Sequence, residues 1–95
     1  MRALIVDDSK PVRGILARIL AEMGYECGQA ADGREASAIL ASAPRPDLVT
    51  INLHMPVMDG FELLRWIRGR AEFARVRSEE HTSELQSRQY LVCRL

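Results

Sequence analysis

The sequence is poor in the features that mark metal-thiolate, membrane and nucleic-acid-binding proteins. Its two cysteines, Cys27 and Cys93, lack the spacing of zinc ligands, so we expect reduced thiols that serve as small core residues. The first apolar run, residues 3–6, is far too short to span a bilayer and leads straight into two aspartates. Thirteen basic residues balance thirteen acidic ones, so no net charge favours nucleic acid or an anionic membrane. We therefore expect a cytoplasmic protein that binds neither nucleic acid directly nor a membrane.

Short apolar runs alternate with amphipathic segments along the 95 residues, which suffice for one small domain. Runs rich in β-branched residues predict buried strands, and apolar residues at helical spacing predict helices. Ser9 fits the N-cap of the first helix, and Asp59 with Glu62 fits that of the third. The predicted strands are residues 3–6, 25–30 and 48–51, and the predicted helices carry apolar residues within 12–23, 36–43 and 61–67, with Phe61, Leu64 and Ile67 facing inward.

This alternation of strand and helix, joined by short loops, predicts right-handed βαβ units and a parallel sheet. Ligands of such sheets bind beyond the carboxyl ends of the strands, where the strand order reverses. Asp7, Asp8 and Asn52 all lie at the carboxyl ends of predicted strands. If the first strand lies between the second and the third, these three side chains meet in one pocket.

Residues 77–95 break the alternation, because no fourth run rich in valine and isoleucine appears where one is due. The segment RSEEHTSELQS back-translates into codons that resemble a common sequencing-library adapter read in frame. We therefore interpret residues 77–95 as a non-native, adapter-derived tail that follows a native part, residues 1–76. The alternative is a genuine polar helix over residues 79–87 followed by a strand over residues 90–95. Even a non-native tail could adopt such structure, or pair with the third strand, without an evolved purpose.

Three blocks of the sequence together resemble the response-regulator receiver family, the CheY-like domains of two-component signalling. They are LIVDDS at the end of the first strand, ADG before the second helix and PDLVTINLHMPVMDGFELLR around the third strand. The resemblance covers residue 1 to about residue 76. It implies an α/β, flavodoxin-like (CheY-like), doubly wound parallel sheet of strand order 2-1-3-4-5. This chain supplies an incomplete version with three of the five strands, in order 2-1-3.

The resemblance also implies the chemistry of the site. In the family, an aspartate at the end of the third strand accepts a phosphoryl group from a sensor histidine kinase, and an output domain or downstream protein responds. By position, Asp7 and Asp8 match the acidic pair that holds Mg²⁺, and Asn52 matches the phosphoacceptor. The backbone carbonyl of His54 matches the remaining protein ligand of the cation. Oxygen ligands suit Mg²⁺, which neutralises charge during phosphoryl transfer.

Asn52 has an amide where this chemistry requires a carboxylate. A neutral amide is a feeble nucleophile towards phosphorus, so we expect no ordinary phosphorylation of the chain as written. The amide oxygen can still ligate a cation, but the loss of one negative charge of three should weaken Mg²⁺ binding. A read error, an engineered block and a natural pseudo-receiver each explain Asn52, and the sequence leaves them open.

The expected loss of strands four and five has structural consequences. The third strand becomes a bare apolar edge, and the first helix loses a neighbour over its stripe of Val12, Ile15 and Ile19. The family's phosphoryl-sensing serine or threonine lies on the fourth strand and its switch lysine on the fifth, so both fall beyond residue 76. Lys10, the only lysine in the sequence, starts the first helix and cannot be the switch lysine. We therefore expect a marginally stable or associating product.

Three functions compete at this point. The first is a phosphorelay receiver domain altered at Asn52, and the second is a pseudo-receiver that binds a partner protein without phosphorylation. The third is a phosphatase-like enzyme with an aspartyl nucleophile. The adjacency of Asp7 and Asp8 disfavours it, because the phosphatase family separates its paired aspartates by one residue. We expect the receiver, and we expect no enzymatic activity.

Overall fold

The computed structural model describes residues 1–42, 45–52, 59–70, 77–82 and 89–95. Strands and helices alternate through the first part of the chain, and two further strands follow. The elements are β1 (Arg2–Val6), α1 (Lys10–Glu22), β2 (Glu26–Ala30), α2 (Gly33–Leu40), β3 (Leu48–Asn52), α3 (Gly60–Arg68), β4 (Arg77–Thr82) and β5 (Gln89–Arg94). No helix in these ranges is long and apolar enough to cross a membrane.

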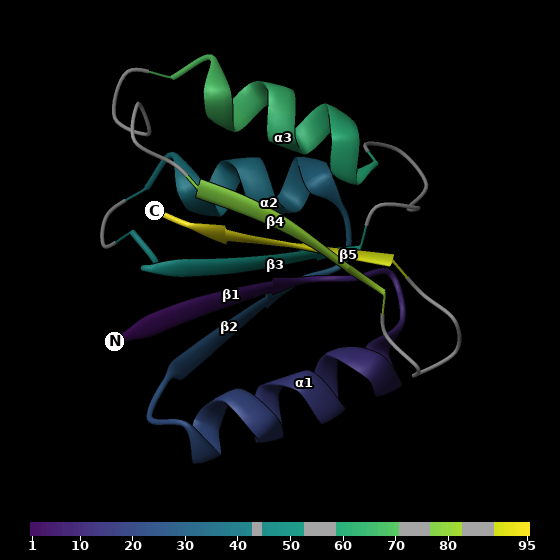
Figure 1. Ribbon diagram of the computed structural model, residues 1–95, viewed down its shortest axis with the longest axis vertical. Coiled ribbons are helices and arrows are strands. Elements are labelled where there is room, and N and C mark those ends of the chain that lie inside the picture. Colours follow the sequence, from purple (N-terminus) through teal and green to yellow (C-terminus); the bar gives the residue numbers. More distant parts are fainter. Residues whose placement is uncertain (43–44, 53–58, 71–76, 83–88) are drawn as a thin grey trace.

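Strand β1 is the middle one of three parallel strands. It pairs with β2 on one side, where Val6 lies opposite Ala30, and with β3 on the other, where Val6 lies opposite Ile51. The order β2-β1-β3 confirms the predicted parallel arrangement. Helix α1 covers one face of the sheet, and α2 and α3 cover the other (Figure 1). Cover on both faces explains why residues 3–6 of β1 form a continuous apolar run and why every residue of β3 is buried.

The third strand is not the bare edge that the sequence led us to expect. β5 pairs with β3 in antiparallel register, from Leu48 opposite Arg94 to Asn52 opposite Tyr90. β4 pairs in turn with β5, so the full order is β2-β1-β3-β5-β4. The sheet therefore has five strands where three were expected. Antiparallel pairing needs no long crossover, so a short segment suffices to cover the open backbone of β3.

The alternative structure proposed for residues 77–95 is half right. A strand was expected over residues 90–95, and β5 (Gln89–Arg94) confirms it. A polar helix was expected over residues 79–87, and this is wrong over residues 79–82, which belong to β4 (Arg77–Thr82). The physical reason is the strand β5, whose backbone N–H and C=O groups on the side away from β3 need hydrogen-bond partners. β4 supplies these partners as a strand, whereas a helix would not.

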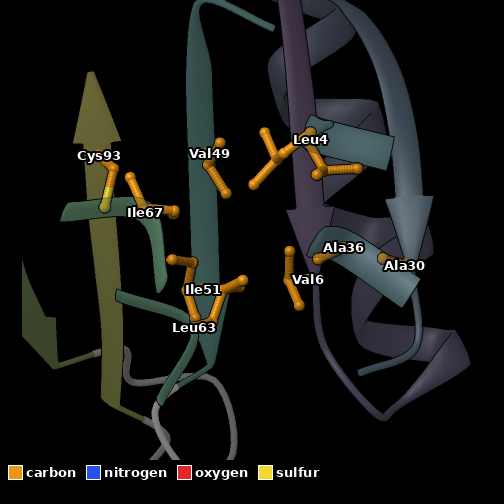
Figure 2. Close-up of a cluster of buried hydrophobic side chains, with 10 residues drawn as sticks. Leu4, Val6, Ala30, Ala36, Val49, Ile51, Leu63, Ile67 and Cys93 are labelled. Carbon is orange, nitrogen blue, oxygen red and sulfur yellow. The ribbon is translucent and has the colours of Figure 1, made fainter. Parts of the chain in front are cut away.

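The larger core lies between the sheet and helices α2 and α3 (Figure 2). On α3, Leu63 and Ile67 are fully buried, whereas Phe61, which was expected to face inward, is 42% exposed. Residues four apart share one face of a helix, so docking through Leu63 and Ile67 turns Phe61 outward. The cluster is Leu4, Val6, Ala30, Ala36, Leu40, Val49, Ile51, Leu63, Ile67 and Cys93, and Cys93 brings β5 into it.

The core under α1 is smaller and contains the buried side chains of Ala3, Ile5, Leu20 and Leu48. The expected shortage of cover along α1 is confirmed at Ile15 and Ile19, which are 44% and 48% exposed. Val12, the remaining residue of this stripe, is fully buried, so only part of the stripe lacks cover, as expected. Ile15 and Ile19 lie one turn apart on a side of α1 that no described helix covers.

The helix starts follow the predicted capping. The Ser9 hydroxyl accepts from the Val12 amide at 3.4 Å, and Asp59 Oδ1 accepts from the Glu62 amide at 2.9 Å. Gly24 follows α1 with a φ of 96°, a left-handed conformation that glycine adopts without strain. The caps at Ser9 and Asp59 fix where α1 and α3 begin, and so limit the loops that follow β1 and β3, where the candidate site lies.

Neither Cys27 nor Cys93 forms a disulfide, in agreement with the reduced thiols that the sequence analysis expected. Cys27 is partly buried in β2 and Cys93 is fully buried in β5. Burial raises the pKa of the Cys27 thiol above its ordinary value, because a thiolate is poorly solvated there. The raised pKa leaves less thiolate on Cys27, which disfavours this side chain as a nucleophile.

Candidate functional site

The carboxyl ends of β1 and β3 lie side by side. Val6 pairs with Ile51 in parallel register, so the residues that follow, Asp7 and Asn52, emerge next to each other. Both are buried, and Asn52 is only 2% exposed. Val6 and Ile51 point towards α2 and α3, so Asp7 and Asn52 point to the α1 side of the sheet.

A hydrogen bond links the two strand ends. Asn52 Nδ2 donates to Asp8 Oδ1 at 3.2 Å, and Asp8 itself is exposed to solvent. The structure thus brings Asp8 and Asn52 into contact and places Asp7 beside them. His54, whose backbone carbonyl completes the predicted set, lies outside the described residues. The assignment of these four positions as cation ligands stays a prediction.

Asp7 is held from several directions. Its Oδ1 accepts from the Ser9 amide at 2.8 Å, and its Oδ2 accepts from the Tyr90 hydroxyl at 2.7 Å. Its backbone carbonyl accepts from Arg13 Nη1 at 2.7 Å, and the same guanidinium donates through Nε to Gln29 Oε1 at 3.2 Å. Arg13 therefore ties the loop after β1 to α1 and β2, which gives the acidic residue a defined position.

Sequence reasoning missed Tyr90. This residue belongs to the segment interpreted as a tail without function, yet the antiparallel register sets it directly opposite Asn52. Its side chain is buried and its hydroxyl reaches Asp7. Only knowledge of the β3–β5 pairing could have revealed this contact, since no local pattern around Tyr90 signals it.

The side-chain oxygen atoms of Asp7, Asp8 and Asn52 partly fit Mg²⁺, the hard cation that the resemblance implies, because hard cations prefer oxygen ligands. Asp8 and Asn52 already meet, and rotation of the Asn52 amide about its last torsion would present Oδ1 in place of Nδ2. Asp7 fits less readily, because both of its carboxylate oxygens already accept hydrogen bonds. Within the described ranges, no group of three or more His, Cys, Asp or Glu side chains is arranged to hold a metal ion. A cation would thus depend on the Asn52 amide.

Comparison with known proteins gives a consistent result. A family model described as the response regulator receiver domain matches residues 3–86. The response regulator MprA of Mycolicibacterium vanbaalenii is 46% identical over 68 residues, which are 72% of this chain and 29% of that protein. Protein-glutamate methylesterase/protein-glutamine glutaminase 2 of Anaeromyxobacter dehalogenans is 47% identical over 62 residues, 64% of this chain and 18% of that protein. The chain thus spans less than a third of the length of these curated relatives.

Solved structures agree with the fold. The signal receiver domain of a histidine kinase from Syntrophus aciditrophicus superposes with a TM-score of 0.72 at 40% identity, over 77% of this chain and 55% of that one. Response regulator TrrA of Thermotoga maritima, solved in complex with Mg²⁺ and BeF, gives a TM-score of 0.70 at 37% identity, over 75% and 61% of the two chains. The α/β architecture is therefore the CheY-like one that the sequence predicted.

Proposed function

Since the chain belongs to the response regulator receiver domain family, we propose that it is a phosphorelay receiver whose phosphoacceptor position, Asn52, accepts no phosphate as written. The observation that carries this proposal is the place of Asn52. It ends β3, is buried, and donates a hydrogen bond to Asp8. A receiver needs its acceptor at this strand end, beside the acidic residues that follow β1.

The chemistry of the side chain limits what this position can do. An aspartate attacks phosphorus with a negatively charged oxygen and forms an acyl phosphate. The amide of Asn52 carries no charge, and its nitrogen lone pair is delocalised into the carbonyl. Asn52 therefore has nearly the size and shape of the aspartate that accepts phosphate, but it lacks the negatively charged oxygen that attacks phosphorus.

We propose that Mg²⁺ is held here by Asp8 and the amide oxygen of Asn52, together with Asp7 and the backbone carbonyl of His54. Bound there, the cation would neutralise negative charge on an incoming phosphoryl group. The structure of the Thermotoga relative with Mg²⁺ and BeF supports the choice of cation. Because affinity depends on the number of charged ligands, Asn52 should make this site weaker than one with three carboxylates.

The proposed partners are a sensor histidine kinase and an output domain or downstream protein. The curated relatives are longer than this chain, which leaves room in them for output functions. We propose that this segment itself is not an enzyme and does not bind nucleic acid directly. The match to the methylesterase covers only 18% of that protein, which supports the first proposal. The formal net charge of zero supports the second, because nothing electrostatic favours nucleic acid.

We propose further that residues 1–76 are the receiver-derived part and residues 77–95 a non-native tail. The direction of β5 supports this division, because β5 runs antiparallel beside β3, where the family order calls for a parallel fourth strand. The family model nevertheless matches as far as residue 86. Sequencing the source locus past codon 76, and rereading codon 52, tests the proposal. A continuous receiver frame in place of residues 77–95 would support it, and the same codons in the genome would contradict it.

The functional test compares the unmodified chain with Asn52→Asp in a small phosphodonor and Mg²⁺, with covalent phosphate measured by intact mass spectrometry. We expect phosphate on Asn52→Asp and none on the unmodified chain, because only the variant has a carboxylate at the end of β3. The matched control is the double variant Asp8→Asn/Asn52→Asp. It keeps the acceptor but loses a cation ligand, so we expect its phosphate uptake to be lost.

Three outcomes would contradict the proposed function. Phosphate on the unmodified chain would show that the amide is no block, or that another residue accepts. Absence of phosphate on Asn52→Asp, in a chain whose circular dichroism matches the unmodified one, would refute the assignment of the acceptor position. Turnover of a phosphomonoester by the unmodified chain would favour a phosphatase.

A second candidate is a pseudo-receiver that binds a partner in one fixed conformation. The hydrogen bonds within the site favour it, because Asn52 donates to Asp8 and Tyr90 donates to Asp7, so protein groups alone tie the site together. A source locus that encodes asparagine at position 52 would support this candidate. Partner affinity that rises on phosphorylation of Asn52→Asp would count against it.

A further inference from the structure

Tyr90 reaches the acidic site from the far end of the chain. It lies opposite Asn52 in the β3–β5 register and points to the same face of the sheet. Its hydroxyl donates to Asp7 Oδ2 at 2.7 Å, and both side chains are buried. A short hydrogen bond to a carboxylate in a buried place is among the stronger neutral-donor contacts in proteins.

The Asp7 carboxylate thus has a donor on each oxygen, the Ser9 amide on Oδ1 and the Tyr90 hydroxyl on Oδ2. Each such bond uses lone-pair density that a cation would otherwise draw on. The Ser9 amide belongs to the same loop as Asp7, so it stays beside Oδ1 whatever else binds. Tyr90 comes from a different strand and is attached to the site through its hydroxyl. It is therefore the donor that a side-chain change can remove while the loop stays intact.

We propose that Tyr90 is a positioning residue that holds Asp7 when no cation is bound and opposes cation binding by competing for Asp7 Oδ2. This inference rests on the proposed function, in which Asp7 belongs to the cation site. The phenol supplies a proton donor without positive charge. It therefore satisfies Asp7 but leaves the negative charge of Asp7 and Asp8 in place. Each carboxylate oxygen keeps a second lone pair, so a cation at Oδ2 would weaken the Tyr90 bond by drawing electron density from the same oxygen.

The competition predicts two effects of opposite sign. Loss of the hydroxyl should destabilise the cation-free chain, because Asp7 loses a buried donor. The same loss should tighten Mg²⁺ binding by about tenfold, since a hydrogen bond to a charged group no longer has to be given up. A residue with a structural role alone would give the first effect without the second.

The decisive variant is Tyr90→Phe, which keeps the ring and removes the hydroxyl. Mg²⁺ is titrated into the full chain and into the variant, and the dissociation constant is measured by isothermal titration calorimetry. We expect a value about tenfold lower for Tyr90→Phe. Tyr25→Phe is the matched control, because Tyr25 is the only other tyrosine and precedes β2 at the opposite end of the sheet. It should bind Mg²⁺ as the unmodified chain does.

A second measurement does not require Tyr90→Phe to fold. In Tyr25→Phe, Tyr90 is the only tyrosine left, so ¹³Cζ-labelled tyrosine gives one nuclear magnetic resonance signal. We expect this signal to shift in proportion to the Mg²⁺ bound, because the phenol hydroxyl loses its acceptor. If Tyr90→Phe fails to fold, the labelled chain decides the matter.

Three outcomes would overturn the inference. They are equal or weaker Mg²⁺ binding by a folded Tyr90→Phe, a Tyr90 signal that stays fixed while Mg²⁺ saturates the site, and no saturable binding by either chain. Phosphate uptake by Asn52→Asp is scored separately by mass. The proposed function can therefore hold when the Tyr90 inference fails, and the Mg²⁺ isotherms can differ when phosphorylation fails.

Discussion

On the face covered by α2 and α3, the buried cluster consists of aliphatic side chains and the Cys93 thiol. The face covered by α1 instead carries the three buried polar residues of the described ranges, Asp7, Thr50 and Asn52. Both sets come from the same strands, because alternate residues of β1 and β3 point to opposite faces. Period-two alternation thus separates two tasks. One face supplies most of the apolar burial, and the other carries the candidate site.

The α1 face is also the less complete of the two. Ile15 and Ile19 remain substantially exposed on α1, and the buried Thr50 hydroxyl has no hydrogen-bond partner among the residues that the structure describes. A buried hydroxyl without a partner lowers stability, as does apolar surface left in water. Substitutions should therefore cause losses on the α2/α3 face and, in places, gains on the α1 face.

Removal of residues 77–95 should have the largest effect, because β5 serves both faces. It contributes Cys93 to the cluster under α3 and Tyr90 to the site under α1. Without β5 the backbone of β3 would lie open along its whole length. Since small domains have net stabilities of about 5–15 kcal/mol, we expect a chain ending at residue 76 to lose cooperative unfolding or to associate.

Thermal melts followed by circular dichroism, with sedimentation velocity, would compare this shortened chain with the full one. An unchanged midpoint and a monomeric shortened chain would mean that the parallel strands stand without β5. The expectation that the full chain is marginal or associating rested partly on a bare β3. Because β5 covers that edge, the exposed stripe on α1 is the remaining reason for it.

The contrast between faces can be measured with one substitution made twice. Ile67→Ala removes a fully buried side chain on α3 and should lower the free energy of unfolding by about 2–5 kcal/mol. Ile19→Ala makes the same change at a half-exposed position on α1 and should lower it by less than about 1 kcal/mol, because little burial is lost. Urea denaturation of both variants gives the two values. Equal losses would show that α1 packs as tightly as α3.

The parallel part of the fold was predictable because its signals are local. Apolar runs mark β1 and β3, and Ser9 and Asp59 cap the helices that follow them. Once strand order is known, Asp7 and Asn52 must meet, since each follows one of the paired residues Val6 and Ile51. The place of the candidate site therefore needed periodicity, the strand order that the family resemblance implies, and the rule that ligands bind beyond the carboxyl ends of parallel strands.

What could not be predicted depends on contacts distant in sequence. Phe61 and Leu64 lie three residues apart and Leu63 and Ile67 lie four apart, so both pairs have helical spacing. Only docking decides which of the two pairs faces the core. Likewise, the contact of Tyr90 with Asp7 depends on the β3–β5 register, and a slip of one residue would turn Tyr90 to the opposite face.

Thr50 offers the smallest effect and the sharpest test of the two faces, because the expected sign is a gain. Thr50→Val replaces the unpartnered hydroxyl with a methyl group of similar size, so it should raise the free energy of unfolding by about 1 kcal/mol. Val49→Thr is the reciprocal control on the same strand. It puts a hydroxyl into the apolar cluster on the other face and should lower stability by about 1–3 kcal/mol. Urea denaturation measures both, and a loss from Thr50→Val would mean that the hydroxyl finds a partner, such as a buried water, in solution.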